Sequence, residues 1–151
     1  ADQGHGAALP VSGGFDPERF FKLARTVGHG RALGLDFHAA GADWVELALP
    51  WREELVSMPG TGVLATGAIV SLVDTCSGTA VWQALGGFRH IVTLDLRLDY
   101  LRAARKGETV IARCECYKVT RRVAFVRGIA HGGDPARAIA HSAATFVIRD
   151  K

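Results

Sequence analysis

Two different spacings of apolar residues divide the chain into helical and strand-like segments. Asp16-Pro17-Glu18 is typical of a helix start, with Asp as the N-cap and Pro in the first turn. Apolar residues then follow at helical spacing, and we expect Gly28 to end the helix. The segments 33–38 and 44–51 alternate with period two instead, and the small residues between them predict a β-hairpin.

A longer helix is predicted from Thr66 or Gly67 to about Leu85, after a glycine-rich loop. Its apolar residues lie nearly all round the helix cylinder, which is typical of a helix that is buried on most sides. Beyond it, period-two alternation and turn residues predict four strands, at 92–100, 109–119, 123–131 and 138–148. The six expected strands must bury an apolar face, and the long helix is the only element apolar enough to cover it. The sequence therefore predicts an α+β domain whose antiparallel sheet wraps around a central helix.

The length of 151 residues suits one domain, which we place at 15–151 behind a flexible arm at 1–14. The net charge of +3 is small and not gathered into runs, so it does not favour nucleic acid as a partner. An odd count of three cysteines argues against a disulfide framework and favours a cytoplasmic location. Apolar runs are too short for a membrane helix, and metal-ligand spacings and nucleotide-cofactor motifs are not found, so neither a metal nor a cofactor is expected.

Asp74 is the outstanding candidate for chemistry, because it lies in the middle of the apolar helix. The residues that share its helix face by three-and-four spacing are mostly apolar: Val70, Val73, Ser77 and Val81. A carboxylate on such a face is costly unless it has partners, and a partly buried carboxylate can act as a base or nucleophile. The alternative is that Asp74 reaches solvent at a gap in the packing, or caps a loop.

Gly67 opens the same helix, where free N–H groups favour negative charge such as an oxyanion, and Thr66 beside it is a candidate for binding a substrate. A packing role would equally explain this glycine. Gly67 and Asp74 share one helix face but are separated by about 10 Å along the axis. A site that uses both needs two chains with antiparallel central helices about a two-fold axis, so we expect a homodimer.

Polar residues of the strand region provide further candidates. Thr93 is expected on the polar side of its strand with Asp95, Arg97 and Asp99, where its hydroxyl can position a water or hold a carboxylate. Exposed threonines are common on sheets, so the pattern alone does not favour a functional role. Basic residues at strand ends and turns are candidates for binding phosphate groups, although each alone is more simply explained as surface charge: Arg102, Arg105, Lys106, Arg121 and Arg122.

The segments Gly62–Asp74 and Val92–Gly107 resemble the hotdog-fold acyl-CoA thioesterases, and the phenylacetate-degradation branch most of all. The similarity runs from about Leu33 to the end of the chain. It implies a hotdog fold, acyl-CoA as the substrate, and a site built across a dimer that is often part of a tetramer. It also implies that Asp74 is the base or nucleophile, that the Gly67 N–H binds the thioester oxygen, and that Thr93 assists. The basic residues would then meet the phosphates of CoA.

Two positions depart from the pattern of that family. The family usually has His-Gly-Gly where this chain has Ala65-Thr66-Gly67, and it often has Asn near the position of Pro59.

The leading hypothesis is a thioesterase for medium-chain or aryl acyl-CoAs. The alternative is a non-catalytic acyl-CoA or fatty-acyl binding module, which the missing His and Asn favour. A hydratase or dehydratase ranks lower, because no histidine lies between His38 and His90.

Overall fold

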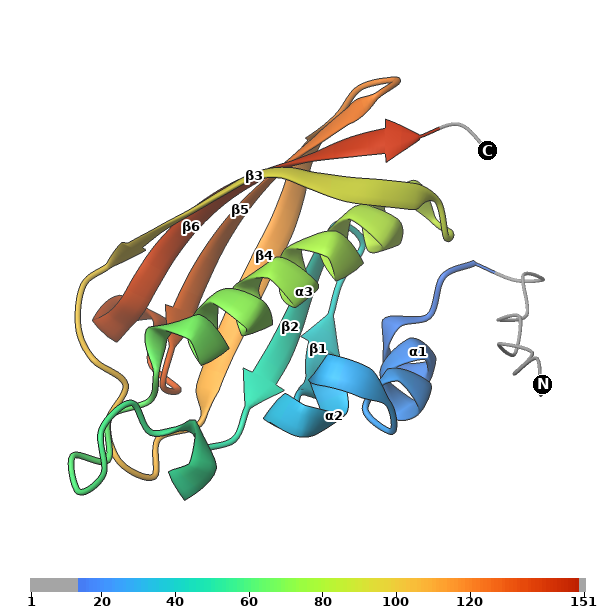
Figure 1. Cartoon of the computed structure of the whole chain (residues 1–151). Helices are drawn as coiled ribbons and strands as arrows, with labels where there is room; N and C mark the ends of the chain where they lie inside the picture. The colour runs from blue at the N-terminus through green and yellow to red at the C-terminus, as the bar shows by residue number, and fades with distance from the viewer. Residues whose placement is uncertain (1–13, 150–151) are drawn as a thin grey trace.

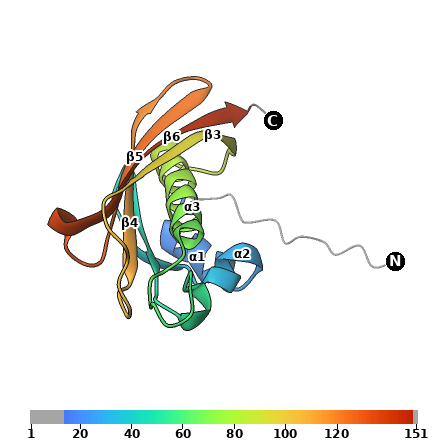
Figure 2. The same cartoon turned by 60° about the vertical axis from the view of Figure 1, so that its left-hand side comes forward.

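The computed structural model describes residues 14–149. One six-stranded antiparallel sheet curves around a single long helix, α3 (Thr66–Leu85), as Figures 1 and 2 show. The strand order is β1-β2-β4-β5-β6-β3, so β3 crosses over to pair with β6 and forms one edge of the sheet. The predicted sheet wrapped around a central helix is confirmed.

The predicted strands are confirmed with small shifts at their ends. The strands are β1 (Asp36–Ala40), β2 (Trp44–Leu49), β3 (His90–Tyr100), β4 (Val110–Val119), β5 (Val123–His131) and β6 (Ala138–Arg149). Short 3-10 helices lie at Glu53–Leu55 and Pro135–Arg137. The hairpin is also confirmed, since β1 pairs antiparallel with β2.

The core lies between α3 and the concave face of the sheet. Its largest fully buried side chains come from both layers, among them Leu47, Leu49, Ile69, Leu72 and Val110. Complete burial of each such side chain contributes about 1.5–3 kcal/mol. Burial of α3 is less complete than its composition predicts, because the sheet curves round only part of the helix and Gly67 and Val70 stay exposed on the open side.

The N-terminal region differs from the prediction of one helix followed by a strand. Helix α1 (Pro17–Ala24) begins as predicted, with the Asp16 carboxylate accepting from the Arg19 N–H. Gly28 does not end this helix but begins a second one, α2 (Gly28–Leu33), which ends at Gly34 with φ +71°. Strand β1 therefore starts at Asp36 and not at Leu33. The left-handed conformation, which glycine adopts without strain, is used here to turn the chain twice.

Strand β3 contains an irregularity that changes which side chains face the helix. Its pairing with β6 runs from Thr93↔Phe146 directly to Asp95↔Thr145, so Leu94 is an extra, bulged residue. Phe146 belongs to the buried core, and Thr93 lies opposite it on the same face of the sheet. The prediction that Thr93 shares the polar face of Asp95, Arg97 and Asp99 is wrong, because the bulge reverses the alternation between them.

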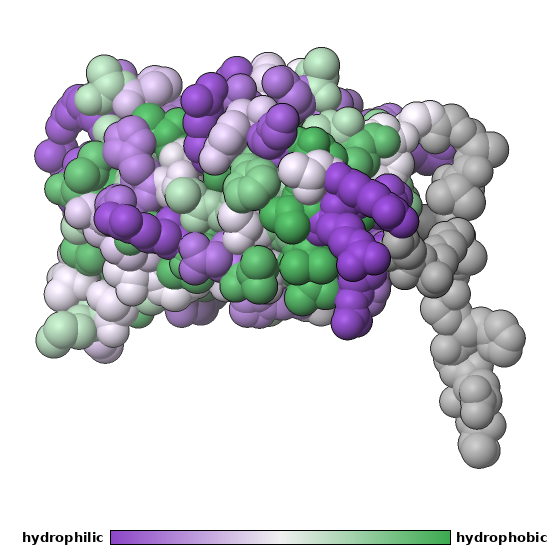
Figure 3. All heavy atoms as spheres, turned by 90° about the horizontal axis from the view of Figure 1, so that it is seen from above, coloured by the Kyte–Doolittle hydropathy of each residue, from purple (hydrophilic) through white to green (hydrophobic). Residues whose placement is uncertain are grey.

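The expected flexible arm at 1–14 lies outside the described residues, apart from Gly14. Within 14–149, none of the helices has the length and hydropathy needed to cross a membrane. Hydrophobic and hydrophilic residues intermingle on the face seen in Figure 3. The most exposed apolar side chains on β3 are Val92 and Leu94, which are 44% and 65% exposed.

An ion pair closes the connection between β3 and β4. The Arg102 guanidinium donates to both carboxylate oxygens of Glu108, at 2.7 and 3.0 Å, and the Arg105 N–H donates to the same carboxylate at 2.7 Å. The hydrogen bond from Arg102 is the main cause of a lowered pKa at Glu108. The charged form of this carboxylate therefore stabilises the folded chain.

We predict that Glu108→Gln lowers the free energy of unfolding by about 1–3 kcal/mol near pH 7, the usual contribution of hydrogen bonds to a charged group. Because the folded pKa is lowered, the contribution is present above the unfolded pKa of about 4.3 and disappears as the pH falls further. Urea unfolding of both proteins from about pH 7 to about pH 3 should therefore show that their free energies of unfolding converge in acid. The matched control is Glu18→Gln, which removes an exposed pair with Lys22. A difference in free energy of unfolding between wild type and Glu108→Gln that does not vary with pH would contradict the prediction.

Candidate active site

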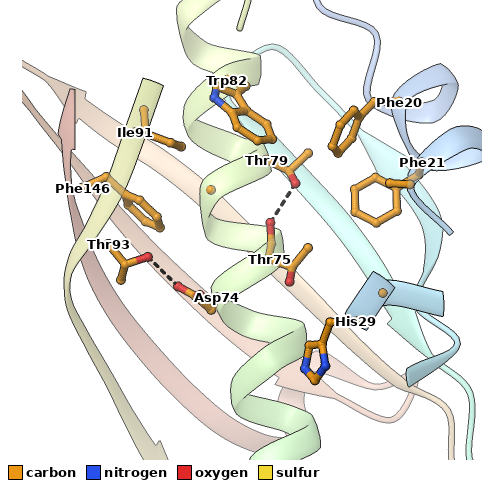
Figure 4. Close-up of a pocket in the computed structure, with 13 residues that line it drawn as sticks. Phe20, Phe21, His29, Asp74, Thr75, Thr79, Trp82, Ile91, Thr93 and Phe146 are labelled. Atoms are coloured by element: carbon orange, nitrogen blue, oxygen red, sulfur yellow. Dashed lines mark hydrogen bonds between the residues drawn. The ribbon is translucent and has the colours of Figure 1, made fainter. Parts of the chain in front are cut away.

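The centre of the candidate site is a hydrogen bond between the helix and the edge strand. The Thr93 hydroxyl donates to Oδ1 of Asp74 at 3.0 Å, and Asp74 is half-buried while Thr93 is exposed (Figure 4). Asp74 therefore has a partner on β3 and does not simply end in solvent or cap a loop. Two of the predicted site residues are brought together, although they are 19 positions apart in the sequence.

A cavity of about 320 Å³ begins at this pair and runs along α3. We call it the α3 cavity; its lining comes from α1, α2, α3, β3 and β6 and consists of Phe20, Phe21, Ala24, His29, Gly30, Asp74, Thr75, Gly78, Thr79, Trp82, Ile91, Thr93 and Phe146. The hydroxyls of Thr75 and Thr79 donate to helix carbonyls one turn earlier, at 2.7 Å each. Apolar rings therefore dominate the cavity, and the Asp74 carboxylate lies at one end, an arrangement typical of ligand pockets.

His29 is a cavity residue that the sequence pattern did not single out. It lies on α2 and points towards α3 (Figure 4). Its Nε2 is 3.1 Å from the Ser71 hydroxyl on α3. Ser71 precedes Asp74 by almost one helical turn, so His29 adds a polar group to the end of the cavity that holds the carboxylate. No local pattern could reveal this role, because α2 is too short for a clear periodicity and only its packing brings His29 to α3.

Gly67 and Thr66 form the first turn of α3, whose N-cap position, Ala65, supplies no side-chain hydrogen bond. Gly67 is exposed, and a Cβ built on it would meet no atom within 4 Å. The Thr66 carbonyl accepts from the Tyr100 hydroxyl at 3.1 Å, and partial burial raises the pKa of Tyr100. The amide end of α3 is thus open, but in one chain it is separated from Asp74 by seven residues of continuous helix.

The five basic candidates do not form one cluster. Arg121 and Arg122 lie in the β4–β5 turn, whereas the other three precede β4, so the length of that strand, about 30 Å, separates the two groups. Arg102 is also less available than expected, because its guanidinium donates to Glu108 and to the carbonyls of Arg137 and Ala103. Lys106 packs against Gly62, just before α3, with its ammonium 5.9 Å from the centre of the Trp51 ring. One chain therefore does not bring all five residues together, and their role in binding phosphate groups stays a prediction.

Residues 61–139 match the family model of the thioesterase superfamily. The match covers Gly67, Asp74 and Thr93 together with α3 and the strands β3 to β5. The chain belongs to the thioesterase superfamily. The family suggested by the two sequence segments is therefore confirmed, without distinction between its branches.

Two curated relatives support this membership over part of their length. A presumed esterase from Haemophilus influenzae is 33% identical over 76 residues, which are 50% of this chain and 54% of that protein. A presumed esterase from Halobacterium salinarum is 36% identical over 76 residues, 48% and 50% of the respective chains. The chain thus spans about half the length of the curated relatives it matches.

Similar solved structures cover nearly the whole chain. A protein from Pseudomonas aeruginosa is 36% identical with a TM-score of 0.76, over 89% of this chain and 96% of that one. A thioesterase from Haemophilus influenzae is 25% identical with a TM-score of 0.78, over 90% and 92%. These similarities and the sheet topology confirm the hotdog fold.

Proposed function

We propose that this protein hydrolyses acyl-CoA thioesters, with Asp74 as the catalytic carboxylate. The observation that carries the proposal is the Asp74 carboxylate, held by the Thr93 hydroxyl at one end of an apolar cavity. An acyl group needs the apolar space, and its thioester carbon needs a nucleophile at the mouth of that space. Both requirements are met at the same place, in a chain of the thioesterase superfamily.

Asp74 can serve in either of two ways. As a general base it takes a proton from water, whose oxygen attacks the thioester carbonyl carbon. The C–S bond then breaks, and the CoA thiolate leaves and takes up the proton that Asp74 removed from water. As a nucleophile it attacks the same carbon directly, the C–S bond breaks and CoA leaves as the thiolate. Water then hydrolyses the resulting mixed anhydride to the free acid and the Asp74 carboxylate. In both cases Thr93 orients the carboxylate or the water, and a backbone N–H stabilises the oxyanion.

The oxyanion donor is the Gly67 N–H of a second subunit in this proposal. Gly67 and Asp74 lie on the open side of the same α3, about 10 Å apart along its axis, so one chain cannot apply both to one carbonyl. A two-fold axis that sets two α3 helices antiparallel brings the Gly67 of one chain to the Asp74 of the other. Exposed Val92 and Leu94 on the edge strand β3 supply apolar surface for such a dimer, and a dimer of dimers extends it.

The aromatic lining favours medium-chain or aryl acyl groups, which is also the preference that the resemblance to the phenylacetate-degradation branch implies. Arg105 and Lys106 are the best placed of the basic residues to bind the CoA phosphates, because Lys106 packs against Gly62 in the loop before α3. Thr66 lies between that loop and Gly67, where it can contact the part of the substrate between the phosphates and the thioester. Cys76, Cys114 and Cys116 are all free thiols, which supports a cytoplasmic location.

Replacing the carboxylate tests the core of the proposal. Asp74→Asn keeps the shape and loses the charge, so we expect kcat for acyl-CoA hydrolysis to fall by about 100-fold or more, the usual contribution of a general base. CoA release can be followed with a thiol reagent over acetyl-, octanoyl- and phenylacetyl-CoA. Circular dichroism checks that the fold persists, and Asp99→Asn, on the outer face of β3, is the control. Unchanged turnover in Asp74→Asn would remove this residue from the mechanism.

The Thr93 hydroxyl is tested by a pair of variants. Thr93→Val keeps the branched shape but donates no hydrogen bond to Asp74, so kcat should fall about tenfold, equivalent to one hydrogen bond to a charged group. Thr93→Ser keeps the donor and should stay within a few-fold of wild type. Equal losses in both variants would assign Thr93 a packing role only.

A subunit-mixing experiment tests the shared site. Gly67→Asp places a negative charge where the oxyanion forms, yet a carboxylate is favourable at a helix N-terminus and should not harm the fold. Each inactive variant, Asp74→Asn or Gly67→Asp, carries the residue that the other lacks, so a mixed dimer contains one intact site. Co-expression should restore up to about one quarter of wild-type activity if subunits pair at random. No restoration, with mixed dimers shown by differential tagging, would place both residues in one chain's site.

A non-catalytic acyl-CoA binding module is the second candidate. Ala65 and Pro59, which stand where related enzymes carry His and Asn, favour it, since neither side chain offers a polar group to the thioester. The same panel of acyl-CoAs distinguishes the two functions, because binding without CoA release selects the module. A hydratase remains lower in rank, because the cavity histidine, His29, pairs with Ser71 and not with Asp74.

A further inference from the structure

The α3 cavity has an inner end that the proposed chemistry does not use. Asp74, Gly78 and Trp82 recur every four residues along α3, so they line one strip of the helix. Asp74 lies at one end of this strip and Trp82 at the other, about 12 Å further along the axis. An acyl group attached to a thioester at Asp74 therefore extends over Gly78 towards Trp82.

The inner end of the cavity is lined by aromatic rings that pack on one another. The Trp82 indole donates through Nε1 to the Arg89 carbonyl at 2.9 Å, which fixes the ring. Its centre is 5.5 Å from that of Phe20 on α1 and 5.0 Å from that of Phe88, and these rings pack edge to face or tilted. Figure 4 shows Trp82 and Phe20 at the end of the cavity away from Asp74. Packed aromatic rings thus line the end of the cavity that is away from Asp74.

Gly78 is an unusual residue for the buried middle of a 20-residue helix. Glycine in a helix interior costs about 0.5–1 kcal/mol relative to alanine. No clash requires it here, because a Cβ at this position would lie 3.6 Å from Ile91 Cδ1 and 3.6 Å from a Phe146 ring carbon, both ordinary contacts. What its missing side chain provides is space, since Gly78, Ile91 and Phe146 all line the cavity.

We propose that Gly78 sets the size of acyl group that the cavity admits, with the Trp82 ring as its end wall. The proposal rests on the proposed thioesterase function and adds a specificity-determining residue to it. Any side chain at position 78 narrows the passage between α3 and the Ile91–Phe146 wall, so it excludes the distal part of the acyl group and leaves the thioester carbon at Asp74 untouched. Short acyl groups do not reach position 78, so a side chain there does not change their kcat/KM.

The test uses Gly78→Ala and Gly78→Val with acetyl-, butyryl-, octanoyl- and phenylacetyl-CoA as substrates. Each added carbon in a packed pocket changes kcat/KM by about tenfold or more, so losses for octanoyl- and phenylacetyl-CoA should grow from Ala to Val. We expect kcat/KM for acetyl-CoA to stay within a few-fold of wild type. Gly78→Ala should also raise the unfolding midpoint, because alanine favours the helix, so its loss of activity cannot be ascribed to misfolding.

Gly87→Ala and Gly87→Val are the matched controls. Gly87 follows the same helix, does not line the α3 cavity, and has no atom within 4 Å of a built Cβ. These variants should leave the order of preference among the four substrates unchanged. Equal losses for acetyl-CoA and octanoyl-CoA in Gly78→Val, or no loss for either, would overturn the role of Gly78.

Binding measurements separate this proposal from the catalytic one. Thioether analogues of the same four acyl-CoAs cannot be hydrolysed, and their affinities are measured by calorimetry. If the wild type hydrolyses no acyl-CoA, the proposed function fails. The size selection still holds if Gly78→Val lowers the affinity for the octanoyl analogue about tenfold and hardly changes the affinity for the acetyl analogue. Identical affinities of wild type and Gly78→Val for the octanoyl analogue would refute it.

Discussion

The hydrogen bond from the Thr93 hydroxyl to the Asp74 carboxylate joins the central helix to the edge strand of the sheet. A carboxylate among apolar helix residues is tolerated only where it keeps partners or access to water. Here the curved sheet covers one side of α3 (Figure 2). On the same helix Gly67 and Val70 are exposed and Asp74 is half-buried. The same geometry that lowers the cost of the charge leaves it accessible to a ligand.

The edge strand owes its part in the site to one extra residue. With regular alternation, Thr93 would lie on the face of Arg97 and Asp99, away from the helix. The bulge at Leu94 lets Thr93 face α3 while the following residues also present Leu96 and Leu98 to the core. A bulge next to a site commonly re-aims a side chain in this way. One inserted position therefore gives β3 a polar contact and an apolar contact on the same face.

The two short N-terminal helices complete the cavity. The wall opposite Ile91 and Phe146 is formed by Phe20 and Phe21 on α1 and by His29 on α2 (Figure 4). At the inner end of the cavity, the ring of Phe20 packs against that of Trp82. These residues come from the segment whose local pattern is weakest. Their position depends on aromatic packing against α3, which contributes mainly through buried apolar area and has no signature in local spacing.

Local pattern alone predicted the helix from Thr66 to Leu85, six strands close to their observed bounds, and a sheet that wraps around the helix. This was possible because strong periodicity and helix-ending glycines are properties of neighbouring residues. It also singled out Asp74, since a charge in an apolar helix is visible in sequence. Only the tertiary structure decided four other features. These are the start of a second helix at Gly28, the orientation of Thr93 towards α3, the contact of His29 with α3, and the separation of the basic residues into two groups. Each depends on a register or a packing contact between segments far apart in the chain, and such contacts are selected by the burial of the whole domain.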